Sequence, residues 1–155
     1  MEKSKELIYG LNDRPPIRET IFAALQHLLA IFVAIITPPL IISSALKFDL
    51  DTTGFLVSMS LFVSGLATFI QCRKFGPIGA GLLCIQGTSF SFISPIIGAG
   101  MLGMVGGKMN VEMGLSYIFG ACLVAAFVEM IVSRLLPYTR KIITPLVSGI
   151  VVSLI

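Results

Sequence analysis

The residues best suited to bind a small molecule lie in the stretch GLLCIQGTSFSF, residues 81–92. The hydroxyl groups of Thr88 and Ser89, together with the bare backbone at Gly87, could form hydrogen bonds to the polar edge of a ligand. The ring of Phe90 could stack on the face of the same molecule. These four consecutive residues therefore predict a binding site for a flat ring with polar edges.

The surroundings of this stretch are apolar, because residues 75–107 contain no Asp, Glu, Lys or Arg. Extended backbone at membrane depth survives only where it is buried in protein or lines a cavity. Broken helices near the membrane midplane form the substrate sites of many transporters, and this segment fits that pattern. The alternative is that Gln86, Thr88 and Ser89 form ordinary hydrogen bonds between helices.

Gln26 and His27 form a second polar pair, in a stretch, residues 20–46, that has no Asp, Glu, Lys or Arg. An ionisable group inside a membrane span is a candidate functional residue. His27, the only histidine in the sequence, could relay protons, hold a neighbouring span in place, or be a satisfied structural residue. We assign Gln26, His27 and Gln86 to support of the site rather than to proton transfer.

No other arrangement of residues suggests catalysis. The sequence has no paired carboxylates, nucleophile triad, phosphate-binding loop or metal-ligand cluster, so we expect no enzyme activity, metal or cofactor. The three cysteines lack metal-ligand spacing and are expected to be small buried hydrophobic residues: Cys72, Cys84 and Cys122. The net charge of +3 does not indicate a nucleic-acid partner, because its placement follows membrane topology.

The elements that must position these residues are membrane spans. Hydrophobic residues make up 55% of the chain and charged residues only 12%, against about 25% charged in a soluble domain. A helix needs roughly 20 apolar residues to cross the hydrocarbon core. The sequence therefore predicts an all-α polytopic membrane protein with four spans and the start of a fifth, from the apolar runs 20–46, 54–72, 75–107, 113–133 and 142–155.

Two spans are expected to be irregular. Pro38 and Pro39 should bend or end the first helix near Thr37. In the third span, nine of the chain's 15 glycines fall between residues 76 and 107, and each interior glycine weakens a helix by about 1 kcal/mol. We expect this span to break into a lead-in segment at 78–84, a short β-strand at 85–89, a half-helix from Phe90 or Ser91 towards Ile97, and an outer loop at 98–108.

The basic residues indicate the orientation of the spans. All of them except Lys47 and Lys108 would lie on one side of the membrane, which the positive-inside rule assigns to the cytoplasm together with the N-terminus. Glu129, near the cytoplasmic end of the fourth span, is expected to snorkel or to pair with Arg134. The last apolar run is too short to cross the membrane, so we expect the chain to be the N-terminal part of a longer protein.

Four motifs together resemble a known family. They are LIYGLNDRPP, LQHLLAIFVAIITP, GLLCIQGTSFSFISP and RKIITPLVSGIVV, in this order and spacing. On these motifs the sequence is similar to the nucleobase–ascorbate transporters, also called nucleobase:cation symporters of the second type. Among them it resembles the bacterial xanthine permeases, and the likeness covers nearly the whole chain.

The resemblance implies 14 spans in two inverted seven-span repeats, divided into a core domain and a gate domain. Residues 1–19 would be a cytoplasmic segment, 20–136 spans one to four of the core, and 137–155 a loop and the start of span five in the gate. Phe90 matches the aromatic residue that packs on the base, and Ser89 matches the polar residue before it. Gln26–His27 matches a Gln-His pair that supports the site.

The resemblance also implies function. It implies proton symport of a purine nucleobase such as xanthine, by a homodimer in a bacterial inner membrane. The family's coupling carboxylates lie in spans eight and ten, so the 155 residues alone are not expected to transport. Two alternatives are a short membrane protein that associates with a full-length homologue, and an anion transporter of the same architecture.

Overall fold

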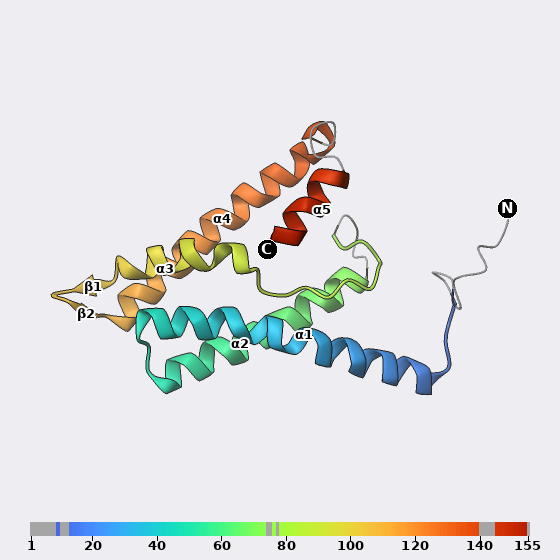
Figure 1. The fold of residues 1–155 in the computed structure, drawn as a ribbon, viewed down its shortest axis with the longest axis horizontal. Helices are drawn as coiled ribbons and strands as arrows, with labels where there is room; N and C mark the ends of the chain where they lie inside the picture. Colours follow the sequence, from blue (N-terminus) through green and yellow to red (C-terminus); the bar gives the residue numbers. More distant parts are fainter. Residues whose placement is uncertain (1–8, 10–12, 74–75, 77, 140–144, 155) are drawn as a thin grey trace.

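The structure is a computed structural model that describes residue 9, residues 13–73, residue 76, residues 78–139 and residues 145–154. Within these residues it is helical, with one small antiparallel hairpin (Figure 1). The elements are α1 (Ile17–Leu46), α2 (Leu50–Cys72), the 3-10 turn η1 (Phe90–Phe92), α3 (Ile93–Met101), β1 (Met104–Val105), β2 (Lys108–Met109), α4 (Val111–Thr139) and α5 (Pro145–Leu154).

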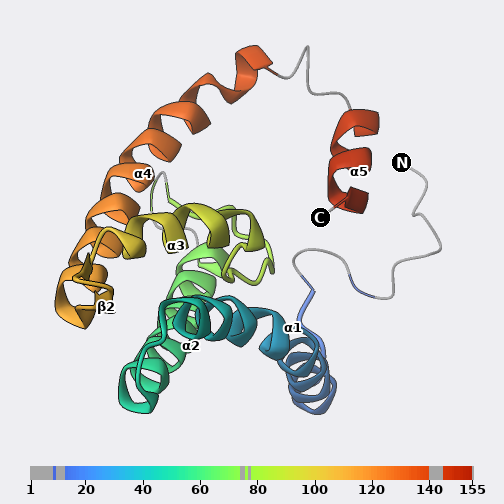
Figure 2. The ribbon, with the colours of Figure 1, turned by 60° about the vertical axis from the view of Figure 1, so that its left-hand side comes forward.

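Helix α1 runs through its two prolines instead of ending at them. It has 30 residues and ends at Leu46, where Lys47 takes a left-handed conformation with φ 54°. Of the two expected effects of Pro38 and Pro39, a bend or an end of the helix near Thr37, the helix does not end there. Figure 2 shows that the N-terminal and C-terminal halves of α1 point in different directions, as expected for a helix that is bent at proline.

Helix α2 returns alongside α1 after a short turn. Its N-cap is Asp49, whose carboxylate accepts hydrogen bonds from the backbone N–H of Thr52 at 3.3 Å and from the Thr52 hydroxyl at 2.5 Å. This cap satisfies backbone donors that the first turn leaves unpaired. Helices α1 and α2 then pack against each other.

The third apolar run is broken, as the glycine content predicts. Residues 79–89 contain no helix, and the chain becomes helical again at Phe90. Residues 83–89 have no assigned strand, so the predicted β-strand at 85–89 is not formed here; a ladder needs a paired strand, and the described residues offer none beside it. The half-helix also continues to Met101, beyond the expected end near Ile97.

The expected outer loop at 98–108 is more ordered than glycine content suggests. Its first residues belong to α3, and its second half forms the β1–β2 hairpin, with Met104 opposite Met109 and Val105 opposite Lys108. Gly106 and Gly107 have φ values of 58° and 81°. Two successive positive φ values are the requirement of a tight two-residue hairpin turn, and glycine meets it without strain.

A small core forms where α1, α3 and α4 meet. Its buried members are Ile42, Leu46 and Ile118. Glycines allow the close approach: a Cβ atom on Gly103 would lie 2.4 Å from the backbone nitrogen of Gly114 on α4. Figures 1 and 2 show α4 diverging from the α1–α2 pair beyond this contact.

The lengths of the apolar helices separate complete spans from a broken one. Three described helices are long and apolar enough to cross a membrane, with bounds Ile17–Leu46, Leu50–Cys72 and Val111–Leu135, and the apolar helix over Phe90–Met101 is too short. The expected third span is thus a lead-in chain plus a half-length helix, because glycine-rich segments gain too little from helix formation. The chain is an integral membrane protein of helical type.

Candidate functional site

The extended segment before η1 is attached to α2 through the backbone of Gln86. The Gln86 N–H donates to Thr68 Oγ1 at 2.9 Å, and the Ser64 hydroxyl donates to the Gln86 carbonyl. Ser64 and Thr68 are one helical turn apart, so their hydroxyls lie on one face of α2. They take the place of the strand that would otherwise satisfy these backbone groups.

The next residues of the segment lie against α1. The Thr88 hydroxyl lies 3.2 Å from the carbonyl oxygen of Ala34 and 3.0 Å from that of Ile35, to which it donates. Gly87 approaches the same place, since a Cβ atom built on it would lie 3.3 Å from Ile35 Cγ1. Both residues thus lie against α1. The hydrogen bonds of Thr88 are of the kind described by the alternative, ordinary bonds to a neighbouring helix.

Ser89 and Phe90 present free surfaces. Phe90 is 43% exposed at the start of η1. Ser89 is exposed and extended, with φ −99° and ψ 130°, and its side chain makes no hydrogen bond to the rest of the described chain. Of the four predicted ligand-binding residues, Gly87, Ser89 and Phe90 are exposed, and only Thr88 is half-buried and hydrogen-bonded to α1.

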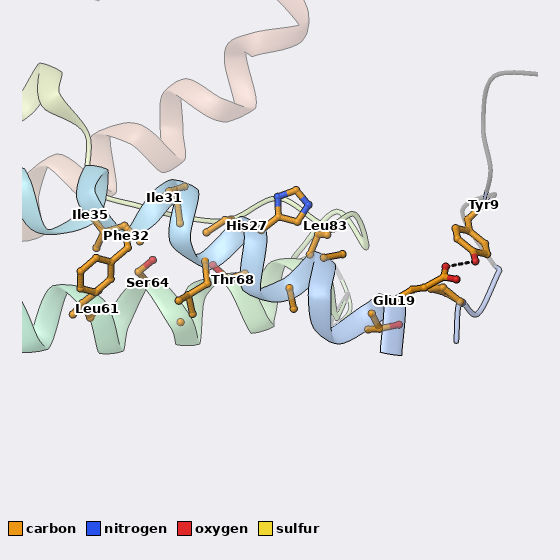
Figure 3. A pocket seen from close by; sticks show the side chains of 17 residues that line it. Tyr9, Glu19, His27, Ile31, Phe32, Ile35, Leu61, Ser64, Thr68 and Leu83 are labelled. Carbon is orange, nitrogen blue, oxygen red and sulfur yellow. Dashed lines mark hydrogen bonds between the residues drawn. The ribbon is translucent and has the colours of Figure 1, made fainter. Parts of the chain in front are cut away.

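His27 lines a cavity of about 800 Å³ between α1, α2 and the segment that follows α2. Figure 3 shows Ser64 and Thr68 on its α2 side and His27 on its α1 side, with Leu83 from the extended segment. His27 is exposed and makes no hydrogen bond to other described residues, so it does not hold the third span in place by itself here.

The other two predicted supporting groups, Gln26 and Gln86, do not line this cavity. Gln26 is exposed on α1 and lies outside this cavity. The Gln86 side chain turns back along its own segment, with Nε2 3.4 Å from the Cys84 carbonyl. At the end of the cavity, the Tyr9 hydroxyl donates to the Glu19 carboxylate (Figure 3), and this hydrogen bond raises the pKa of Tyr9.

A second hollow, which we call the α4 groove, lies between α1, α2, η1 and α4. Its volume is about 670 Å³, and Thr88, Ser89 and Phe92 line it together with Glu129 of α4. Among the described residues Glu129 forms no ion pair with Arg134, so the expected pairing is not seen. Glu129 instead lines the α4 groove together with Ser89.

Neither hollow contains a set of metal ligands. Within the described residues no group of three His, Cys, Asp or Glu side chains lies close enough to hold a metal ion. Cys72 is half-buried, whereas Cys84 and Cys122 are exposed in this chain. The expectation that all three would be buried is therefore wrong for the 155 residues, since α4 and the lead-in segment lack neighbours that would cover them.

Sequence reasoning missed two residues that organise the site. Ser64 and Thr68 were not among the predicted site residues. The signal was their spacing of four in the second span, because two hydroxyls on one face of an apolar helix need a polar partner. That partner is the backbone of Gln86.

Apolar spanning helices and a broken span with polar backbone contacts are typical of membrane transport proteins. The family model described as "Permease family" (Xan_ur_permease) matches residues 18–155. The chain belongs to this family, the nucleobase–ascorbate transporters.

The chain is similar to several named permeases. It is 51% identical over 153 residues to xanthine permease XanP of Escherichia coli, covering 99% of this chain and 33% of that protein. It is 43% identical over 150 residues to E. coli xanthine permease XanQ, covering 97% and 32%. The uric acid-xanthine permease of Emericella nidulans is 34% identical over 163 residues, covering 95% and 28%.

The chain thus spans about one third of the length of the curated relatives it matches. No solved structure matches it significantly.

Proposed function

We propose that these residues form the first spans of a secondary transporter that carries purine nucleobases, with xanthine as the substrate, by proton symport. The observation that carries the proposal is the break at residues 79–92, because it leaves extended backbone and an exposed aromatic ring between membrane helices. The names of the similar proteins give the substrate class.

The substrate would contact Phe90 through its ring face and Ser89 through its polar edge. Both side chains are exposed, and Ser89 lines the α4 groove, whereas Thr88 and Gln86 are already bonded to helices. Gln26 and His27 would support this site from α1 once the rest of a full-length chain is present. Residues 1–19 would lie in the cytoplasm, and 137–155 would lead into the gate domain of a 14-span homodimer.

A direct test is uptake of radiolabelled xanthine by cells that lack their own purine transporters and express a full-length chain containing these residues. We expect saturable uptake that uracil competes with weakly and that a protonophore abolishes. Uptake that continues unchanged after the proton gradient is removed would exclude proton symport. Absence of any purine uptake, with normal membrane insertion, would exclude the proposed substrate class.

A further inference from the structure

The two prolines of α1 and the threonine of the extended segment occupy complementary positions. In a helix the N–H of each residue donates to the carbonyl four residues earlier. Proline has no N–H, so Pro38 leaves the Ala34 carbonyl without its donor, and Pro39 does the same for Ile35. These are the two carbonyls that Thr88 Oγ1 approaches, at 3.2 Å and 3.0 Å.

We infer that Pro38, Pro39 and Thr88 form one device, in which the proline pair creates the hydrogen-bond acceptors that hold the broken span against α1. Thr88 is then a positioning residue for Ser89 and Phe90, and it does not itself bind the substrate. This inference rests on the proposed function only for the role of Ser89 and Phe90.

The hydrogen bonds between Thr88 and the two carbonyls of α1 are important because they are shielded from water. Ile35, Pro38 and Pro39 are buried, and Thr88 is half-buried against them. Water is scarce at this depth, and serine or threonine hydroxyls are among the groups that satisfy carbonyls freed by proline in membrane helices. The single Thr88 proton serves two acceptors, which fixes the segment over one place on α1.

The position of the segment is fixed from both sides. Thr88 lies two residues after Gln86, whose backbone is bonded to α2. Gly87 lies between them, and its missing side chain allows contact with Ile35. Hydroxyls from α2 therefore hold one residue and carbonyls of α1 hold the other, so η1 begins from a defined point.

The first experiment measures this position without transport. Cysteines replace Ile35 and Gly87 in a full-length chain whose native Cys72, Cys84 and Cys122 are serine, and disulfide formation is followed by mass spectrometry in membranes. The Ile35 carbonyl remains, because only its side chain changes. We expect rapid crosslinking, slowed at least ~5-fold by Thr88→Val and restored by Thr88→Ser, since an unsatisfied buried carbonyl costs enough to undock the segment.

The second experiment tests the link to proline. Pro38→Ala with Pro39→Ala returns both N–H donors, so Thr88→Val should have no further effect on crosslinking or on the KM of xanthine uptake in that background. Equal crosslinking rates for Thr88, Thr88→Val and Thr88→Ser would overturn the inference, whether or not the proline variant folds.

A loss of uptake on Thr88→Val that persists in the proline-free background, with unchanged crosslinking, would instead make Thr88 a substrate contact. If the unmodified chain takes up no purine, the proposed function fails, and crosslinking still decides the role of Thr88.

Discussion

The backbone N–H of Gln86 donates to the Thr68 hydroxyl on α2 at 2.9 Å, eighteen positions away along the chain. Ser64, one turn earlier, donates to the carbonyl of the same residue. A break in a membrane helix normally exposes backbone groups to lipid. Here two side chains of a neighbouring helix satisfy the backbone N–H and carbonyl of Gln86 within the break.

Removing these hydroxyls should loosen the segment. Thr68→Val and Ser64→Ala each leave one backbone group of Gln86 unpaired, which costs about 1–3 kcal/mol. We expect faster amide hydrogen exchange in residues 82–89, measured by mass spectrometry in detergent. Ser60→Ala is the matched control, because its hydroxyl bonds to Val57 of its own helix at 2.9 Å. Equal exchange in all three variants would contradict a role for these bonds.

Phe90→Ala should weaken xanthine uptake by a full-length transporter carrying this segment. Stacking of a base on an aromatic ring contributes about 1–3 kcal/mol, so KM should rise roughly 5- to 100-fold. Phe90→Tyr keeps the aromatic ring, so its KM for xanthine should stay near that of the wild type. An unchanged KM for Phe90→Ala would remove this residue from the site.

His27→Gln separates support from proton transfer. Glutamine can form hydrogen bonds but cannot titrate near neutral pH. We expect His27→Gln to keep both xanthine uptake and its dependence on external pH, whereas His27→Leu should lose most uptake. Uptake rates measured between pH 5 and 8 provide the check. A Gln variant that takes up xanthine but no longer responds to the proton gradient would show that His27 carries protons.

Gly103→Ala should destabilise the contact between α3 and α4. The added Cβ would lie 2.4 Å from the Gly114 backbone nitrogen, and forced overpacking of this kind costs about 1–3 kcal/mol. Gly98→Ala, whose added Cβ meets nothing within 4 Å, is the matched control on α3. The unfolding midpoint of the purified chain in detergent should fall for Gly103→Ala only, and a fall of equal size in both would point to a general effect of alanine.

Acid should weaken the start of α2. Hydrogen bonds from the Thr52 side chain and backbone lower the pKa of Asp49 from its usual 3.8. Because the folded-state pKa of Asp49 is lowered, the ionised cap stabilises the fold at pH values above the unfolded-state pKa. This stabilisation is lost as the pH falls through the folded-state pKa. Asp49→Asn keeps a good cap without titrating. The thermal midpoint of the parent should therefore fall more than that of Asp49→Asn between pH 6 and pH 3.

The sequence itself determined the class of protein and the place of its irregularity. Long uncharged runs indicate membrane helices, because lipid does not solvate charged groups and a helix satisfies its own backbone hydrogen bonds. Glycine at nine positions between 76 and 107 makes a continuous helix there unfavourable. Its motifs also identified the family. These features are local in the chain, so periodicity and composition are enough to reveal them.

Only the tertiary structure decided which polar groups remain free for a ligand. From the sequence, Gly87, Thr88, Ser89 and Phe90 were all candidate ligand contacts, because nothing local states which neighbour each residue meets. The fold brings carbonyls of residues 34 and 35 to Thr88 and hydroxyls of α2 to Gln86. Hydrogen bonds between residues more than fifty positions apart depend on how helices pack, and here they hold Thr88 against α1 while Gly87, Ser89 and Phe90 stay exposed.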